Sequence, residues 1–148
     1  WHDPHYYSES LDLAAGNNII DAPENEYDLE TVYTRTSKAS AASDWIMKVN
    51  GDSMEPVYPQ GCFVYVAHGE EVPLGEVGVF LVDGSYVMKE HREDGLYSYR
   101  AKRRNYLFSE DSEIRPFGRV MGIVEDGDMV KGEKLREVIE AFERKDEE

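Results

Sequence analysis

Trp45-Ile46-Met47-Lys48-Val49-Asn50 leads directly into Gly51-Asp52-Ser53-Met54-Glu55-Pro56, and this stretch decides how the fold is interpreted. The first half is mostly apolar and is typical of a strand. The second half begins with Gly-Asp-Ser, which is typical of a tight turn because glycine accepts positive φ and both polar side chains bond nearby amides. We therefore expect a strand that ends in a turn, with the hydroxyl of Ser53 presented by that turn.

Lys89 follows the apolar run Tyr86-Val87-Met88 further along the chain. The Asp83-Gly84 pair before this run is typical of a type I′ turn, so we expect Lys89 on the second arm of a tight hairpin. A serine hydroxyl becomes a good nucleophile when a base removes its proton, and lysine serves as that base only when it is uncharged. Burial among apolar neighbours favours the uncharged form and lowers the lysine pKa.

Each of these residues also has a purely structural interpretation. Ser53 alone is ordinary turn chemistry, and Lys89 alone is typical of a strand lysine whose stem packs while its charged head reaches water. Upstream, Ala14-Ala15-Gly16 alone is typical of a flexible linker. The three together, in this order, are more informative than any one of them.

Together, Ser53, Lys89 and the upstream Ala-Ala-Gly sequence resemble the LexA and phage-repressor family of self-cleaving peptidases. The resemblance implies that Ser53 attacks the bond between Ala15 and Gly16 of its own chain while a neutral Lys89 takes the serine proton. We expect the backbone amides of Ser53 and Met54 to stabilise the oxyanion that forms. The resemblance also implies a LexA- and signal-peptidase-like β fold of short strands.

The resemblance covers most of the chain, from about Tyr6 to about Asp126. Residues 61–66 resemble the family's Gly-Asp-x-Val-x-Val strand, except that Cys62 stands where aspartate is usual. This departure does not involve Ser53 or Lys89. Other segments that resemble the family are 74–80, 95–99, 104–106 and 118–124. In the segment formed by 95–99 and 104–106, a proline usual in the family is missing.

Short runs rich in Val, Tyr, Phe and Ile, separated by Gly, Pro and Asp turns, predict a mainly β fold. We divide the chain into a linker with the candidate cleavage segment at 1–26, a peptidase and dimerisation domain at 27–130, and a helix at 131–148. The predicted strands are 29–34, 45–50, 62–67, 77–82, 86–91, 96–100 and 115–125.

The C-terminal segment has the pattern of an amphipathic helix. Leu135, Val138, Ile139 and Phe142 fall at positions that form a single apolar stripe. Such a stripe needs a partner, either this domain or a second subunit. We favour packing on this domain, because a terminal helix most often docks on its own domain.

The chain of 148 residues carries a net charge of −15, with 16 basic residues against 31 acidic ones. DNA binding draws most of its affinity from Lys and Arg against phosphate, so we do not expect this part to read DNA. The basic cluster at 100–104 is interpreted as a solvated turn. Repressors of the family carry a helix-turn-helix domain before the linker, and this sequence starts at Trp1 without methionine. We therefore expect a C-terminal fragment that reaches DNA only through an absent N-terminal domain.

The composition fits one cytoplasmic domain that needs no cofactor. A chain of this length buries a core without disulfides, and its single cysteine, Cys62, suits a reducing compartment. No apolar run is long enough to span a membrane, which separates the chain from membrane-anchored signal peptidases. His2 and His5 lack the further ligands that a metal site needs, and His91 is expected at the rim of the Lys89 site.

Three functions are compatible with these patterns. The first is the regulatory domain of a repressor that cuts its own Ala15–Gly16 bond and separates the DNA-binding half from the dimerising half. For this function the resemblance implies a homodimer and, in many members, activation by the RecA filament. The second is a non-enzymatic module controlled by an antirepressor or another protease, and the third is a UmuD-like polymerase accessory subunit. We favour the first, because serine, lysine and cut site are all present.

Overall fold

The fold is built from short, strongly apolar strands that alternate with turns. The protein is seen in a computed structural model, which describes residues 5–14, 30–32, 34–129, 133, 136–137 and 140–141. The described elements, in chain order, are β1 His5–Ala14, β2 Glu30–Val32, α1 Lys38–Ala41, β3 Trp45–Asn50, β4 Phe63–His68, β5 Val77–Val82, β6 Ser85–Arg92, β7 Gly95–Tyr97, β8 Tyr106–Leu107 and β9 Ile114–Ile123.

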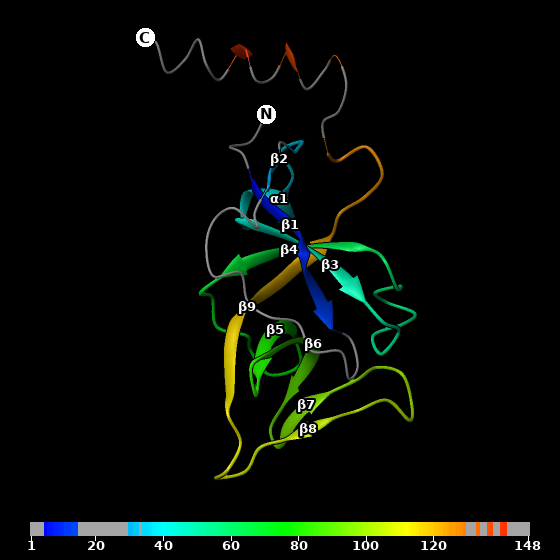
Figure 1. Ribbon diagram of the computed structural model, residues 1–148, viewed down its shortest axis with the longest axis vertical. Coiled ribbons are helices and arrows are strands. Elements are labelled where there is room, and N and C mark those ends of the chain that lie inside the picture. Colours follow the sequence, from blue (N-terminus) through cyan, green and yellow to red (C-terminus); the bar gives the residue numbers. More distant parts are fainter. Residues whose placement is uncertain are drawn as a thin grey trace.

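These strands form one curled sheet in the order β2-β1-β3-β4-β9-β5-β6-β7-β8. Neighbouring strands are antiparallel, except that β1 runs parallel to β3 and, at Ala14, also pairs in parallel with β6. The first part of β9 pairs with β5 and its last part pairs with β4, so β9 joins the two halves of the sheet. In Figure 1, β3 and β4 lie near the upper end of β9, and β5 to β8 lie near its lower end. The prediction of a mainly β fold of short strands is confirmed.

The hairpin that carries Lys89 has the turn that the sequence predicts. Asp83 and Gly84 both have positive φ, at 48° and 85°, as a type I′ turn requires. On either side of them Val82 pairs with Ser85, and the antiparallel register continues to the pair of Val77 and Glu90. The turn chemistry therefore fixes which residue of β5 lies opposite Lys89.

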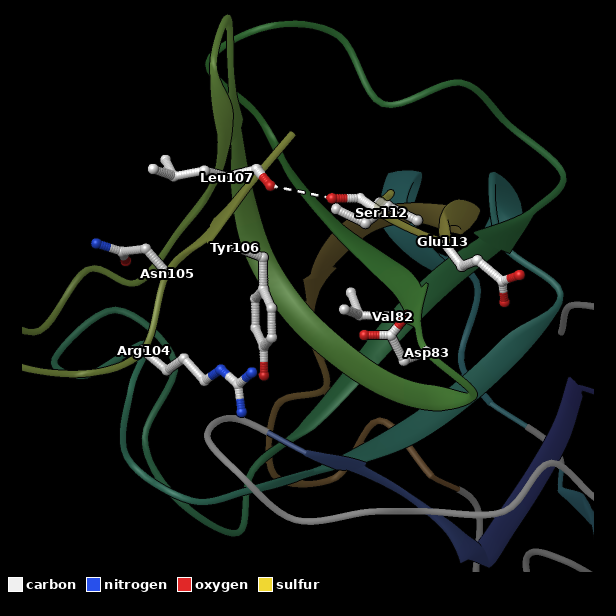
Figure 2. Close-up of a pocket in the computed structure, with 9 residues that line it drawn as sticks. Val82, Asp83, Arg104, Asn105, Tyr106, Leu107, Ser112 and Glu113 are labelled. Atoms are coloured by element: carbon white, nitrogen blue, oxygen red, sulfur yellow. Dashed lines mark hydrogen bonds between the residues drawn. The ribbon is translucent and has the colours of Figure 1, made fainter. Parts of the chain in front are cut away.

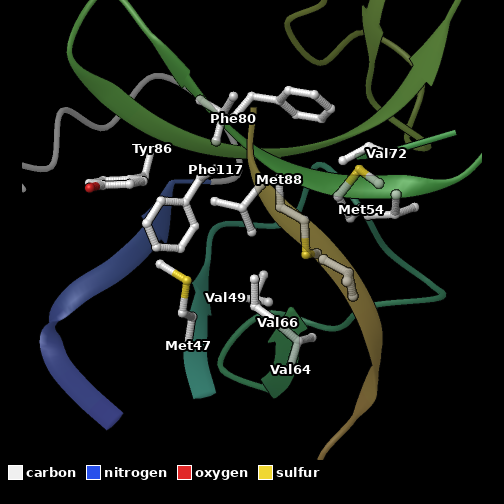
Figure 3. Close-up of a cluster of buried hydrophobic side chains, with 14 of the residues drawn as sticks. Met47, Val49, Met54, Val64, Val66, Val72, Phe80, Tyr86, Met88 and Phe117 are labelled. Carbon is white, nitrogen blue, oxygen red and sulfur yellow. The ribbon is translucent and has the colours of Figure 1, made fainter. Parts of the chain in front are cut away.

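The core is formed where the sheet curls and side chains from its different strands point toward one another. Figure 3 shows labelled side chains from β3, β4, β6 and β9 pointing toward one another, among them Met47, Val64, Met88 and Phe117. Burying one such side chain completely contributes about 1.5–3 kcal/mol relative to leaving it in water. The completely buried members of this cluster are Met47, Val49, Met54, Val64, Val66, Val79, Met88 and Leu96.

Three elements differ from the sequence-based expectations. β1 lies inside the stretch predicted as a linker. Its sequence has no clear hydrophobic period, and it is a strand because its backbone pairs with β2 and β3. β8 was also not predicted, and it consists of two residues paired with β7. The unpredicted helix α1 is a single turn capped by Ser37, whose side chain accepts from the amide of Ser40 while the Ser40 side chain bonds back.

The predicted C-terminal helix falls largely outside the described residues. Glu133, Arg136, Glu137, Glu140 and Ala141 are helical and exposed, whereas the residues of the apolar stripe are not described. The helix, its packing and the domain boundaries therefore stay predictions. In the described part of the chain, no helix has the length and apolar character that crossing a bilayer requires.

Candidate active site

The turn after β3 holds Ser53 inside the molecule. The turn begins at Gly51, whose φ is 90°. Glycine adopts positive φ with little conformational strain because it has no Cβ atom. On the far side of Ser53, the Met54 carbonyl accepts a hydrogen bond from the Tyr58 amide at 2.9 Å, and the Met54 side chain is completely buried in the core. Ser53 itself has 0% of its surface exposed. The turn is therefore anchored by backbone bonds and by a buried side chain.

Lys89 lies in β6 opposite Gly78 of β5, and it also has 0% of its surface exposed. Its Nζ donates a hydrogen bond to Ser53 Oγ at 2.8 Å. Burial lowers the pKa of Lys89 from 10.5 to about 8, because desolvation disfavours the ammonium form. Within residues 34–129, whose side chains the structure describes, no ion pair involves Lys89 and no acidic residue is buried. The structure thus brings together the two residues that the sequence singles out.

The curl of the sheet is what brings Ser53 and Lys89 together. Ala14, the last residue of β1, pairs both with Asn50 at the end of β3 and with Val87 in β6. β1 runs parallel to both strands, so β3 and β6 run in the same direction on either side of Ala14. The Ser53 turn follows Asn50, and Lys89 follows Val87 by two residues. The end of β1 therefore marks the place where the serine turn and the lysine strand meet.

Asp52, directly before Ser53, is held by two arginines from the loop between β7 and β8. Arg103 donates to both carboxylate oxygens, from Nε at 2.7 Å and from Nη2 at 2.9 Å, and Arg100 Nη1 donates at 2.7 Å. The hydrogen bonds from Arg103 lower the pKa of Asp52 to about 2, and the charges of both arginines act in the same direction. The Arg100 amide also donates to the Ser53 carbonyl at 2.9 Å.

The basic cluster at 100–104 is a partly exposed turn, as expected, but Arg100 and Arg103 also hold Asp52, which the sequence did not predict. Asp52 lies in the turn after β3, whereas the arginines lie in the loop between β7 and β8. Their contact therefore depends on tertiary folding and not on local sequence. The only sequence signal for it is the presence of several arginines in one loop and an acidic residue beside the candidate nucleophile. Opposite charges at these positions suggest an ion pair, but they do not identify the partners.

The predicted oxyanion donors, the amides of Ser53 and Met54, lie in the same turn. In the part of the chain that the structure describes, neither amide donates to a backbone carbonyl of the turn or of a loop. The bonds that build the turn use other donors, those of Glu55 and Tyr58. The role of the two amides stays a prediction.

Other sequence-based expectations concern the cleavage residues, Cys62 and a metal site. The predicted cleavage residues, Ala15 and Gly16, lie outside the described residues, which stop at the adjacent Ala14 in this part of the chain. Burial raises the pKa of the half-buried Cys62 thiol to about 11, so the thiol is protonated near neutral pH. No group of His, Cys, Asp and Glu side chains within the described ranges is arranged to hold a metal ion.

Neither Ser53 nor Lys89 lines either of two hollows on the described surface. The first, of about 230 Å³, lies beside the β5–β6 turn and β8, and Figure 2 shows Tyr106 and Arg104 facing it. The second, of about 300 Å³, has mainly apolar walls and includes His91. His91 Nδ1 lies 2.6 Å from the Val72 carbonyl oxygen, and His91 lines the second hollow. Its expected place at the rim of the Lys89 site stays a prediction.

Comparison with known families adds an independent observation. A family model described as Peptidase S24-like matches residues 6–117. The matched region is more than half of the chain, and it contains Ser53, Lys89 and the arginines that hold Asp52. A comparison with curated proteins finds no match.

Proposed function

Because this chain belongs to the Peptidase S24-like family, we propose that it is the regulatory domain of a repressor that cuts itself between Ala15 and Gly16. The family is one of serine peptidases and includes LexA- and UmuD-like domains. The observation that carries the proposal is the 2.8 Å hydrogen bond from Lys89 Nζ to Ser53 Oγ, formed between two completely buried side chains. A lysine with a pKa of about 8 is neutral in a useful fraction of molecules near physiological pH.

The proposed reaction has two stages. Neutral Lys89 takes the proton of the Ser53 hydroxyl as Oγ attacks the carbonyl carbon of Ala15, and negative charge forms on the carbonyl oxygen beside the amides of Ser53 and Met54. The Ala15–Gly16 bond then breaks, and the lysine proton passes to the nitrogen of Gly16, which leaves as an amine. Water finally hydrolyses the ester between Ser53 and Ala15, with Lys89 as the base, and restores the serine hydroxyl.

The course of β1 supports self-cleavage over cleavage of another protein. Its last residue, Ala14, directly precedes Ala15, whose bond to Gly16 is the proposed scissile bond. Ala14 pairs with Asn50 and Val87, which lead into the serine turn and to the lysine. A substrate tethered in this way needs no separate binding step, so its effective concentration at the site is high. Even a slow catalytic pair can therefore act on its own chain.

The acidic composition supports a regulatory role and not a DNA-reading one. With a net charge of −15, these residues are unsuited to contact phosphates, so we assign DNA binding to a separate N-terminal helix-turn-helix domain. Cleavage at Ala15–Gly16 then disconnects that domain from this one in the cytoplasm. A RecA filament or an antirepressor is the proposed partner that controls the reaction.

Alkaline incubation tests the proposed function. We expect intact-mass measurements to show two new fragments whose boundary lies between Ala15 and Gly16, because raising the pH deprotonates Lys89. Ser53→Ala should remove the nucleophile and leave the chain whole, and Ser43→Ala, which changes another buried serine, serves as the matched control. Cleavage at a different bond, or an equal rate in Ser53→Ala, contradicts the proposal.

We also propose that the domain forms a symmetric homodimer, because operators with two half-sites require proteins with two-fold symmetry. Sedimentation at micromolar concentrations should then give twice the monomer mass of 17.0 kDa. A monomer at every concentration up to several hundred micromolar contradicts this assignment. The result is independent of cleavage, since Ser53→Ala is expected to dimerise equally well.

A further inference from the structure

We propose that Asp52, Arg100 and Arg103 form a clamp that positions Ser53 for Lys89. Resting on the self-cleavage proposed above, this Asp52 clamp holds the backbone on which the nucleophile is mounted and takes no part in proton transfer. None of its three charged groups bonds to Ser53 Oγ or Lys89 Nζ in the described structure. They act on the Ser53–Lys89 pair, called the dyad below, only through the turn.

The clamp grips the serine turn at two adjacent points. Arg103 makes a two-pronged contact with the Asp52 carboxylate, and Arg100 adds a third hydrogen bond to the same group. The Arg100 amide then donates to the carbonyl of Ser53 itself, at 2.9 Å. A two-pronged arginine–carboxylate contact fixes direction as well as distance. Together, these bonds restrict both rotation and displacement of the peptide units around Ser53.

The loop that supplies the arginines is itself held in shape. Ser98, at its start, bonds across the loop: its amide donates to Asn105 Oδ1 at 2.8 Å and its hydroxyl donates to the Arg104 carbonyl at 2.6 Å. Lys102 has a φ of 65°, a left-handed conformation that turns the loop back on itself. The two arginines therefore project from a closed loop whose two ends are joined.

The connectivity explains why such a clamp is useful. Lys89 lies on β6, β6 pairs with β7, and the clamp loop follows β7. Ser53, in contrast, follows β3, which is separated from β6 by β4, β9 and β5 in the sheet order and is bridged to it at Ala14 of β1. The Asp52 clamp thus ties the serine turn to the same group of strands that carries the base. Small movements between the two parts of the sheet are then less able to lengthen the Ser53–Lys89 contact.

The clamp is better suited to positioning than to stabilising the fold. The side chains of Arg103 and Asp52 are 37% and 29% exposed, and ion pairs with this much solvent contact usually add little to stability. Because the pKa of Asp52 is about 2, its carboxylate remains charged throughout the alkaline range in which Lys89 titrates. Removing the clamp should therefore change the maximal cleavage rate without changing the pH at which half of that rate is reached.

Asp52→Asn is the first test, in the full chain at alkaline pH. We expect the plateau cleavage rate to fall about 10- to 100-fold, the loss typical of small misplacement of reacting groups. The midpoint of the pH–rate profile should remain at the value of the unaltered protein, and the melting temperature should change little. Arg103→Lys, which keeps the charge but loses the two-pronged contact, should retain more activity than Arg103→Gln.

Arg119→Gln is the matched control. Arg119 pairs with Glu76 at 2.7 Å and the two side chains are 36% and 42% exposed, so this ion pair resembles that of Arg103 and Asp52. In the described structure, however, no hydrogen bond joins it to the turn that carries Ser53. We expect Arg119→Gln to cleave at the unaltered rate. The double variant Asp52→Asn with Arg103→Gln should cleave no more slowly than Asp52→Asn alone, because the carboxylate that Arg103 holds is already gone.

Two results overturn the clamp. One is an Asp52→Asn variant that cleaves at the unaltered plateau rate, or whose slower rate is explained entirely by a shifted pH midpoint. The other is a crystal structure of Asp52→Asn in which Ser53 Oγ and Lys89 Nζ still lie at their original hydrogen-bond distance. The second measurement does not depend on cleavage, so it decides the positioning role even if the unaltered chain never cuts itself, an outcome that would reject the proposed function instead.

Discussion

Lys89→Met is expected to abolish cleavage between Ala15 and Gly16 while leaving the fold intact. Methionine keeps most of the volume of lysine but has no amine, so Ser53 loses the base whose Nζ lies 2.8 Å from its Oγ. General base catalysis contributes about 10²–10⁴-fold to a rate. We therefore expect the cleavage rate to fall by at least about 100-fold, measured as loss of intact chain by mass spectrometry.

The same substitution should leave the protein as stable as before, or more stable. The difference between a lysine pKa of 10.5 and one of about 8 corresponds to about 3 kcal/mol that burial of the ammonium costs at neutral pH. Against this gain, the buried Ser53 hydroxyl loses its partner, which costs about 1–3 kcal/mol. The two effects nearly cancel, so we expect the free energy of unfolding to stay the same or to rise by up to about 2 kcal/mol.

The stability difference should also depend on pH in a defined direction. The folded-state pKa of Lys89 lies below that of the unfolded chain, so between about pH 8 and 10.5 the unfolded state binds the extra proton. The stability of the unaltered protein therefore gains from rising pH in this window, relative to Lys89→Met. The advantage of the methionine variant is complete below about pH 8 and disappears near pH 10.5.

Lys48→Met provides the control, since Lys48 is a partly buried lysine in β3 that is not part of the dyad. It should cleave at the unaltered rate. If Lys89 were instead the partner of a buried carboxylate, Lys89→Met would leave an unpaired charge and cost on the order of 3 kcal/mol or more. A destabilised Lys89→Met variant that still cuts at the unaltered rate would falsify the Ser–Lys mechanism.

Cleavage by the unaltered protein is expected to accelerate about 100-fold between pH 6 and pH 9. Only the neutral form of Lys89 accepts the serine proton, and with a pKa of about 8 that form is about 1% of the total at pH 6 and about 90% at pH 9. The rate should therefore rise about tenfold per pH unit below pH 8 and level off above it. Single-turnover measurements at constant ionic strength would record this profile.

The shape of this profile separates the enzyme-like reaction from ordinary alkaline hydrolysis. Hydroxide-driven cleavage keeps rising above pH 9, shows no plateau and proceeds equally in Ser53→Ala. A midpoint near 10.5 would mean that Lys89 titrates like an exposed lysine, which contradicts the pKa that its burial produces. Asp52→Asn, by contrast, is expected to lower the plateau without moving the midpoint.

Much of this architecture was predictable from local patterns. β3 and β5 were predicted with their observed bounds, because a run of apolar residues between turn signals is recognisable in a few residues of sequence. The Asp83-Gly84 turn was predictable for the same reason, since two positive φ values demand residues of this kind. Ser53 and Lys89 stood out because a turn serine and a strand lysine occur here in the order typical of one family.

Other features depend on residues that meet only in the folded chain. The pairing of Ala14 with both Asn50 and Val87 requires the sheet to curl, and no local period encodes that curl. The contact of Arg103 with Asp52 likewise depends on the path of the loop after β7, which local charge cannot specify.

Residue types and their order along the chain were thus enough to indicate a β fold and a Ser–Lys pair, because strand periodicity and turn chemistry act over a few neighbouring residues. The 2.8 Å approach of Lys89 to Ser53 and the burial that lowers the lysine pKa were decided by tertiary packing. Desolvation and hydrogen-bond distance depend on every element that surrounds a group, and those elements come from distant parts of the chain.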